Sequence, residues 1–190
     1  MRHSLTLAIM VYAVGLLSHA GIAWADATTT QEGNAAAQSD LKNLFTTEAA
    51  LFAVTQHYGF TNGDEGKSCI QLSMNPDTAS LGGDQWDDFV CAKSNDGTPR
   101  SERLSLGNKV AVIVHTNATS SAFIAMAKHE AGDRCYAMDS DSTNIYEGEG
   151  PACAAGRVLS PELIKAIGNT ENKDDLAQAS SSDVVWRQAP

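Results

Sequence analysis

A long amphipathic segment, residues 34–60, constrains the fold of this chain more than any other feature. Asn34 or Ser39 can cap its start, and Gly59 stands where helices commonly stop in a left-handed conformation. Its apolar residues recur at the 3.6-residue period of an α-helix; they are Ala37, Leu41, Leu44, Phe45, Leu51 and Phe52. We expect a helix over residues 34–58 whose apolar stripe is covered by a sheet, with these large apolar residues in the core.

One acidic residue interrupts the stripe. Glu48 follows Leu41 by seven positions, so its carboxylate points towards the apolar side of the helix. One interpretation places it at the edge of the helix–sheet interface, where it reaches solvent or pairs with a lysine, because ionised carboxylates are seldom buried without a partner. The other interpretation is a buried, functional carboxylate.

Residues 1–25 have the pattern of a secretory signal peptide. A basic start containing Arg2 precedes an apolar run over residues 5–17, and Ala23-Trp24-Ala25 supplies a small-x-small cleavage site. The run is shorter than the ~20 apolar residues that a membrane-spanning helix needs. We therefore expect export with cleavage after Ala25, no membrane span in the mature chain, and a location in the periplasm, at the cell surface or in an extracellular filament.

Charge and cysteine content fit an exported protein. Removing residues 1–25 takes away Arg2 and leaves 12 basic and 23 acidic residues, a net charge of −11. Such a surface disfavours nucleic acid as a partner, since phosphate binding requires clustered Lys and Arg. The four cysteines, Cys69, Cys91, Cys135 and Cys153, all follow the cleavage site. An even number in an exported chain indicates disulfides.

Three pairings of these cysteines are possible. We favour Cys69–Cys91 and Cys135–Cys153, because each closes a loop of about 20 residues and contributes about 3 kcal/mol in the chain-entropy model. Zinc binding is the rival interpretation, but the chain has no C-x-x-C and no Cys/His cluster at ligand spacing.

The patterns in the rest of the chain predict an α+β domain in which the helix packs on an antiparallel sheet. Residues 109–146 alternate between apolar and polar positions and are interrupted by short turns, which predicts an antiparallel sheet of three or four strands. Small Ala125, Ala127 and Ala137 would let the helix lie close to this sheet. The connection over residues 61–108 is rich in Gly, Asp, Asn and Ser and holds two short strand-like stretches.

Domain boundaries follow from these patterns. We expect a flexible leader over residues 26–33, a globular domain over 34–153, and a C-terminal extension over 154–190 with a short helix at 160–168. The apolar patch at residues 184–186 either docks on the domain or serves a partner.

No pattern in the chain supports catalysis. His129-Glu130 lacks the second histidine of a zinc-protease helix, and residues 139–143 lack the glycine and the glutamate that complete a calcium loop. No glycine-rich phosphate loop or nucleophile elbow is present. We therefore predict no catalytic residue, no cofactor and no metal site.

Two stretches resemble type IV pilins. NAAAQSDLKNLFTTEAALFAVTQHYG, from Asn34, is similar to the second half of the long pilin helix. VAVIVHTNATSSAFIAMAKHEAGDRCYAMDSDSTNIY, from Val110, is similar to the sheet of many short bacterial pilins. The resemblance implies one long N-terminal helix on an antiparallel sheet with a disulfide-closed end, and a structural rather than enzymatic function.

The chain departs from the pilin pattern at its start. It has no short leader ending in Gly followed by a long apolar helix with an early glutamate; its first glutamate is Glu32. In this it resembles the separately exported globular subunit of a split pilin, which implies a short helical pilin or another pilus component as partner. The contact would lie near the start of the helix, at Asn34, Ala37, Ser39 and Asp40. A periplasmic or surface binding or adhesion module on a pilin-like fold is the alternative, and a periplasmic enzyme is a third.

Overall fold

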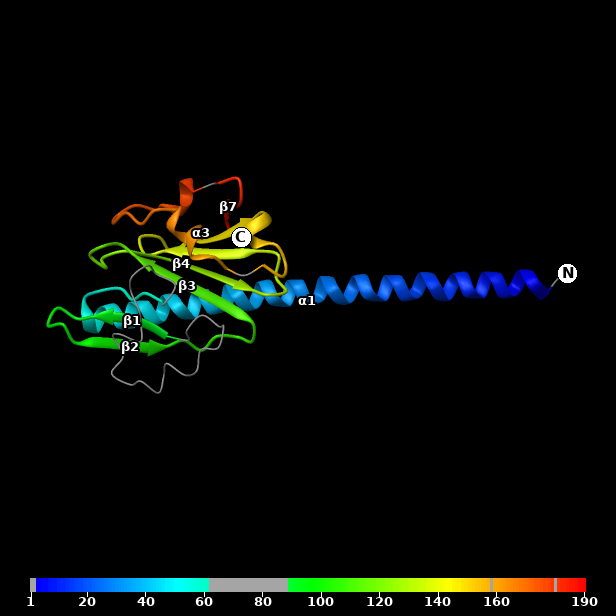
Figure 1. Cartoon of the computed structure of the whole chain (residues 1–190), viewed down its shortest axis with the longest axis horizontal. Coiled ribbons are helices and arrows are strands. Elements are labelled where there is room, and N and C mark those ends of the chain that lie inside the picture. Colours follow the sequence, from blue (N-terminus) through cyan, green and yellow to red (C-terminus); the bar gives the residue numbers. More distant parts are fainter. Residues whose placement is uncertain (1–2, 62–88, 158, 180) are drawn as a thin grey trace.

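The computed structural model describes residues 3–61, 89–157, 159–179 and 181–190. It has an α+β architecture in which one long helix, α1 (His3–Thr55), packs on antiparallel sheets. In Figure 1 the first half of α1 projects from the globular body, while its second half lies along the sheets. Within the described part of the chain, no helix carries an apolar stretch long enough to cross a bilayer.

The helix ends earlier than predicted, at Thr55, and not at Gly59. Gln56 adopts the left-handed conformation (φ 62°) that stops the helix. Gly59 has a different role, because a Cβ there would clash with the Val90 side chain and lie 2.8 Å from Leu51 Cδ2. The glycine is required for close packing beside the helix rather than for the helix end.

Five antiparallel strands form the main sheet, in the order β3 (Val110–Thr116), β4 (Phe123–His129), β5 (Cys135–Asp139), β6 (Ile145–Glu149) and β7 (Val185–Gln188). A second sheet pairs β1 (Phe89–Lys93) with β2 (Pro99–Arg103). The predicted count of three or four strands is therefore wrong. The fifth strand comes from the tail, whose residues 184–186 dock on the domain. β1 coincides with one of the two strand-like stretches predicted in the 61–108 connection, residues 89–92, whereas β2 was not predicted.

The first face of the main sheet packs against α1. Leu41, Leu44 and Leu51 are buried there, as predicted. They meet the alternating residues of β3 to β5, which include Val112, Val114, Phe123, Ala125, Ala127, Tyr136 and Met138. Phe45 and Phe52 are only partly buried, but the Phe45 ring lies tilted at 6.0 Å from that of Phe123, and the Phe52 ring stacks at 4.4 Å on that of Tyr58.

The second face carries a separate apolar core, which we call the tail core. It joins Ile113, Ile124, Met126 and Ala137 to residues of the last 40 positions, among them Leu159, Ile164, Leu176, Val184 and Trp186. Ala137 was predicted to face the helix, and this is wrong, because its partner across the ladder is Met126, which points to the tail core.

Short elements build the tail. They are η2 (Pro151–Cys153), α3 (Pro161–Lys165), η3 (Leu176–Gln178) and β7. The predicted helix at 160–168 is thus shorter, although Ser160 caps it by accepting a hydrogen bond from Glu162 N. Residues after 154, predicted as an extension, contribute to one of the two cores of the sheet.

Candidate functional site

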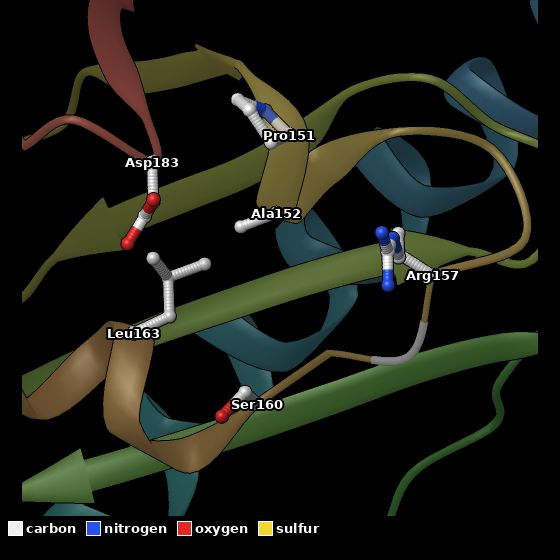
Figure 2. Close-up of a pocket in the computed structure, with 6 residues that line it drawn as sticks. All are labelled: Pro151, Ala152, Arg157, Ser160, Leu163 and Asp183. Carbon is white, nitrogen blue, oxygen red and sulfur yellow. The ribbon is translucent and has the colours of Figure 1, made fainter.

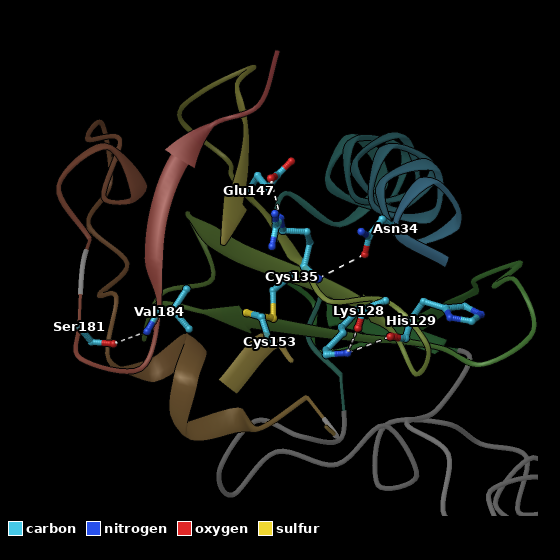
Figure 3. Close-up of a disulfide and its surroundings, with 10 residues drawn as sticks. Asn34, Lys128, His129, Cys135, Glu147, Cys153, Ser181 and Val184 are labelled. Carbon is cyan, nitrogen blue, oxygen red and sulfur yellow. Dashed lines mark hydrogen bonds and ion pairs between the residues drawn. A yellow bond between two sulfur atoms is a disulfide. The ribbon is translucent and has the colours of Figure 1, made fainter. Parts of the chain in front are cut away.

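The start of the packed part of α1 is held to the turn between β4 and β5. The Asn34 side chain donates to Asp133 Oδ1 at 2.8 Å. Its amide oxygen accepts from Arg134 N at 3.3 Å, beside Cys135 at the start of β5 (Figure 3). A Cβ on Gly33 would lie 2.6 Å from His129 Nδ1, and one on Gly132 would lie 2.5 Å from Asn34 Oδ1. Both glycines therefore allow the helix and the turn to touch.

A buried lysine supports the same turn. Lys128 is only 2% exposed, and its ammonium donates to the carbonyl oxygens of His129 and Gly132, both at 2.9 Å. Burial lowers the pKa of Lys128, while the nearby carboxylates of Asp133 and Glu130 oppose that shift. The lysine closes the turn against which Asn34 packs.

Most of the predicted partner-contact residues are used inside the domain. Asn34 is tethered as described, Ala37 is fully buried, and Asp40 Oδ2 accepts from Gly107 N at 2.6 Å. Ser39 is exposed. A partner contact at these four positions stays a prediction, and Ser39 is the one whose side chain faces solvent.

Before Gly33, the described side chains of α1 are mostly outside the core. Residues 27–29, 31 and 32 are exposed, and Figure 1 shows the helix here leaving the body of the domain. We call residues 27–32 the helix stub. It is an already helical segment that the sheet does not cover.

Glu48 is fully buried, so the interpretation that places it at the edge of the interface is wrong. Its Oε2 accepts a hydrogen bond from Gly59 N at 2.7 Å, and its Oε1 has no partner among the described residues. Burial raises the pKa of Glu48 to about 8, although the bond from Gly59 acts in the opposite direction. The carboxyl is thus mainly protonated at neutral pH and ties the helix to the segment that follows it.

The disulfide Cys135–Cys153 joins the start of β5 to η2, as predicted (Figure 3). Cys91 is also disulfide-bonded, and its predicted partner Cys69 lies outside the described residues. Residues 62–88 of the 61–108 connection lie outside them too. Among the described residues, no group of His, Cys, Asp and Glu is arranged to hold a metal ion.

A surface pocket of about 320 Å³ lies beside the disulfide-closed segment. Pro151, Ala152 and Leu163 give it an apolar lining, and Arg157, Ser160 and Asp183 give it polar groups (Figure 2). The sequence analysis did not identify these residues. They come from separate short elements of the tail, and no periodic pattern indicated that the tail would bring them together.

No protein-family model, no curated protein and no solved structure matches this chain.

Proposed function

We propose that this chain is a non-enzymatic globular subunit that associates with a short helical pilin, or another pilus component, in a type IV pilus or a related secretion assembly. The observation that carries the proposal is the helix stub. The helix continues beyond the Asn34 contact through residues 27–32, of which 27–29, 31 and 32 are exposed, so a helical partner can pack beside an existing helix.

Further support comes from the order of the elements. A long helix is followed by an antiparallel meander of β3 to β6, and a disulfide closes the segment after that meander. The same order is implied by the resemblance of residues 34–59 and 110–146 to pilins. Under the proposal, residues 1–25 are a cleaved signal peptide, and the subunit works in the periplasm, at the cell surface or in a filament.

Affinity purification of the mature protein from its native cells tests the proposal. We expect a short, apolar helical protein to co-purify in stoichiometric amount, identified by its mass. Purified assemblies that contain this chain and no such companion would contradict the proposal.

A matched pair of variants locates the contact. Ser39→Trp enlarges the exposed position among the predicted contact residues, so we expect it to lower the recovered partner by tenfold or more, roughly the cost of 1.4 kcal/mol. Thr143→Trp makes the same change at an exposed position between β5 and β6, outside the predicted contact residues, and should leave recovery unchanged. Equal recovery from both variants would place the partner elsewhere.

The pocket lined by Arg157 and Asp183 favours a second candidate, a periplasmic or surface binding or adhesion module on the same fold. A protein that purifies alone and retains a small ligand fits this candidate and not the first.

A further inference from the structure

We propose that the pocket between η2, α3 and the Asp183 loop binds a short zwitterionic peptide with apolar side chains. The proposal does not rest on the pilus function, because it uses only residues of the tail. The carboxylate of the peptide would meet Arg157, its ammonium group would meet Asp183, and its side chains would lie over Ala152 and Leu163 (Figure 2).

The size and lining of the pocket match a small ligand. Its volume of about 320 Å³ is at the lower end of the roughly 300–1,000 Å³ usual for ligand sites. Ala152 and Leu163 are partly buried and pack against the tail core, so they form a stable apolar surface. Ligand pockets typically combine such a surface with a few polar groups that orient the ligand.

The two charges stand on different sides of this apolar surface (Figure 2). Arg157 and Asp183 are both exposed, and neither forms an ion pair with another described residue. Asp183 Oδ1 has only a long contact, 3.5 Å, with the Ser182 hydroxyl. A ligand with opposite charges at its two ends can satisfy both groups, and an unblocked peptide has that arrangement.

Ser160 adds a third polar group. Its hydroxyl oxygen accepts from Glu162 N at 3.3 Å, which leaves the hydroxyl hydrogen to donate to an acceptor in the pocket. The guanidinium of Arg157 presents paired N–H groups that suit a carboxylate. Together they would form the anion-binding end of the pocket.

The rim that carries Asp183 is held in place. Ala152 N donates to the Asp183 carbonyl oxygen at 3.3 Å, and Gly150 lies so close to that carbonyl that a Cβ would clash with it. Cys153 anchors η2 to β5 through the disulfide. The site is therefore largely preformed, which limits the entropy that binding must overcome.

A nuclear magnetic resonance titration with L-leucyl-L-leucine tests the proposal on the full mature protein. We expect saturable shifts of the Leu163 and Ala152 methyl signals, with a dissociation constant on the order of 1 mM, because exposed ion pairs contribute only about 1 kcal/mol or less each. The blocked analogue, N-acetyl-L-leucyl-L-leucine amide, lacks both charges and should bind at least fivefold more weakly.

Substitutions separate the two ends of the site. Arg157→Gln and Asp183→Asn should each weaken peptide binding about two- to fivefold. Arg187 is an exposed arginine on β7 outside the pocket, so Arg187→Gln is the control and should leave binding unchanged. Absence of methyl shifts in the wild-type protein would overturn the proposal. So would equal binding of the free and blocked peptides, or binding that neither pocket variant weakens.

Discussion

α1 covers one face of the five-stranded sheet as a single regular element, whereas short segments cover the other face. On the helix face, successive turns of α1 supply Ala37, Leu41, Leu44 and Leu51, and β1 and the segment after β2 add only Val90, Ala92 and Leu104. On the tail face they come from η2, α3, η3 and β7, which are joined to the sheet by a disulfide and by strand pairing. The difference teaches that a long helix buries a face through its repeating apolar stripe, aided by a few polar contacts, while an irregular cover is joined to the sheet by a covalent link and by strand pairing.

The two faces of the sheet also differ in how they satisfy a buried carboxyl group. The helix face buries Glu48 with one carboxyl oxygen unpartnered among the described residues. On the far side, Asp139 is also buried, but its two oxygens accept from Asp141 N and Asp175 N at 2.9 Å each. The β5–β6 turn and the tail each give this buried acid a free backbone donor, which a continuous helix does not have at its middle because its own N–H groups are already bonded.

Truncating one core side chain on each face should have the largest effect. Leu41→Ala should lower the free energy of unfolding by about 4 kcal/mol, and Ile164→Ala by about 2 kcal/mol, because the short α3 can collapse into the space more easily than α1. Both side chains are at most 1% exposed, so a difference in burial cannot account for a difference in the cost of truncation. Urea denaturation measures the two values, and a larger loss at Ile164 would reverse the comparison. Val54→Ala, at a side chain 67% exposed, is the control and should cost little.

Removing the disulfide tests whether the tail face depends on it. Replacing Cys135 and Cys153 together with serine opens an 18-residue span and should cost about 3 kcal/mol. Hydrogen exchange should accelerate first in η2 and β7 and last in α1. Uniform acceleration over both faces would show that the disulfide acts on the whole domain.

Because Glu48 is buried on the helix face of the sheet, we predict that the stability of the protein depends on pH. Its folded-state pKa of about 8 lies above the ordinary glutamate value of 4.5, so between these pH values the folded protein binds more protons than the unfolded chain. The free energy of unfolding should therefore fall by about 2–3 kcal/mol as the pH rises from about 6 to about 8, the upper part of this window. Glu48→Gln should remove most of the slope in denaturation curves measured at several pH values. An unchanged slope in this variant would show that Glu48 does not titrate as proposed.

The smallest expected effect is at the cap of α3. Ser160→Ala removes the acceptor for Glu162 N and should cost about 1 kcal/mol. Thermal unfolding measures it, and Ser182→Ala, at an exposed loop position, is the matched control. A cost above that of the disulfide variant would mean that this cap supports much more than one short helix.

Local periodicity explains which parts of the fold could be predicted. The stripe of Leu41, Leu44 and Leu51 and the alternation through β3 and β4 repeat over enough residues to show which side faces the core. The burial of Glu48 and the true orientation of Ala137 could not be predicted, because the first depends on Gly59 approaching the helix and the second on strand register.

The residues of the candidate sites were also predictable only in part. The sequence pointed to the start of the helix, but only the structure showed that Asn34, Ala37 and Asp40 are engaged within the domain and that Ser39 is exposed. The pocket at Arg157 and Asp183 had no sequence signal, since its residues come from segments too short to be periodic.

The sequence by itself determined an α+β domain with one amphipathic helix and an antiparallel sheet, and it favoured the local disulfide between Cys135 and Cys153 that the structure has. Those features depend on residues close together in the chain. Only the tertiary structure decided that the tail adds β7, builds the second core and forms a pocket. These depend on contacts between distant residues, whose formation is governed by the packing of the whole domain and not by local pattern.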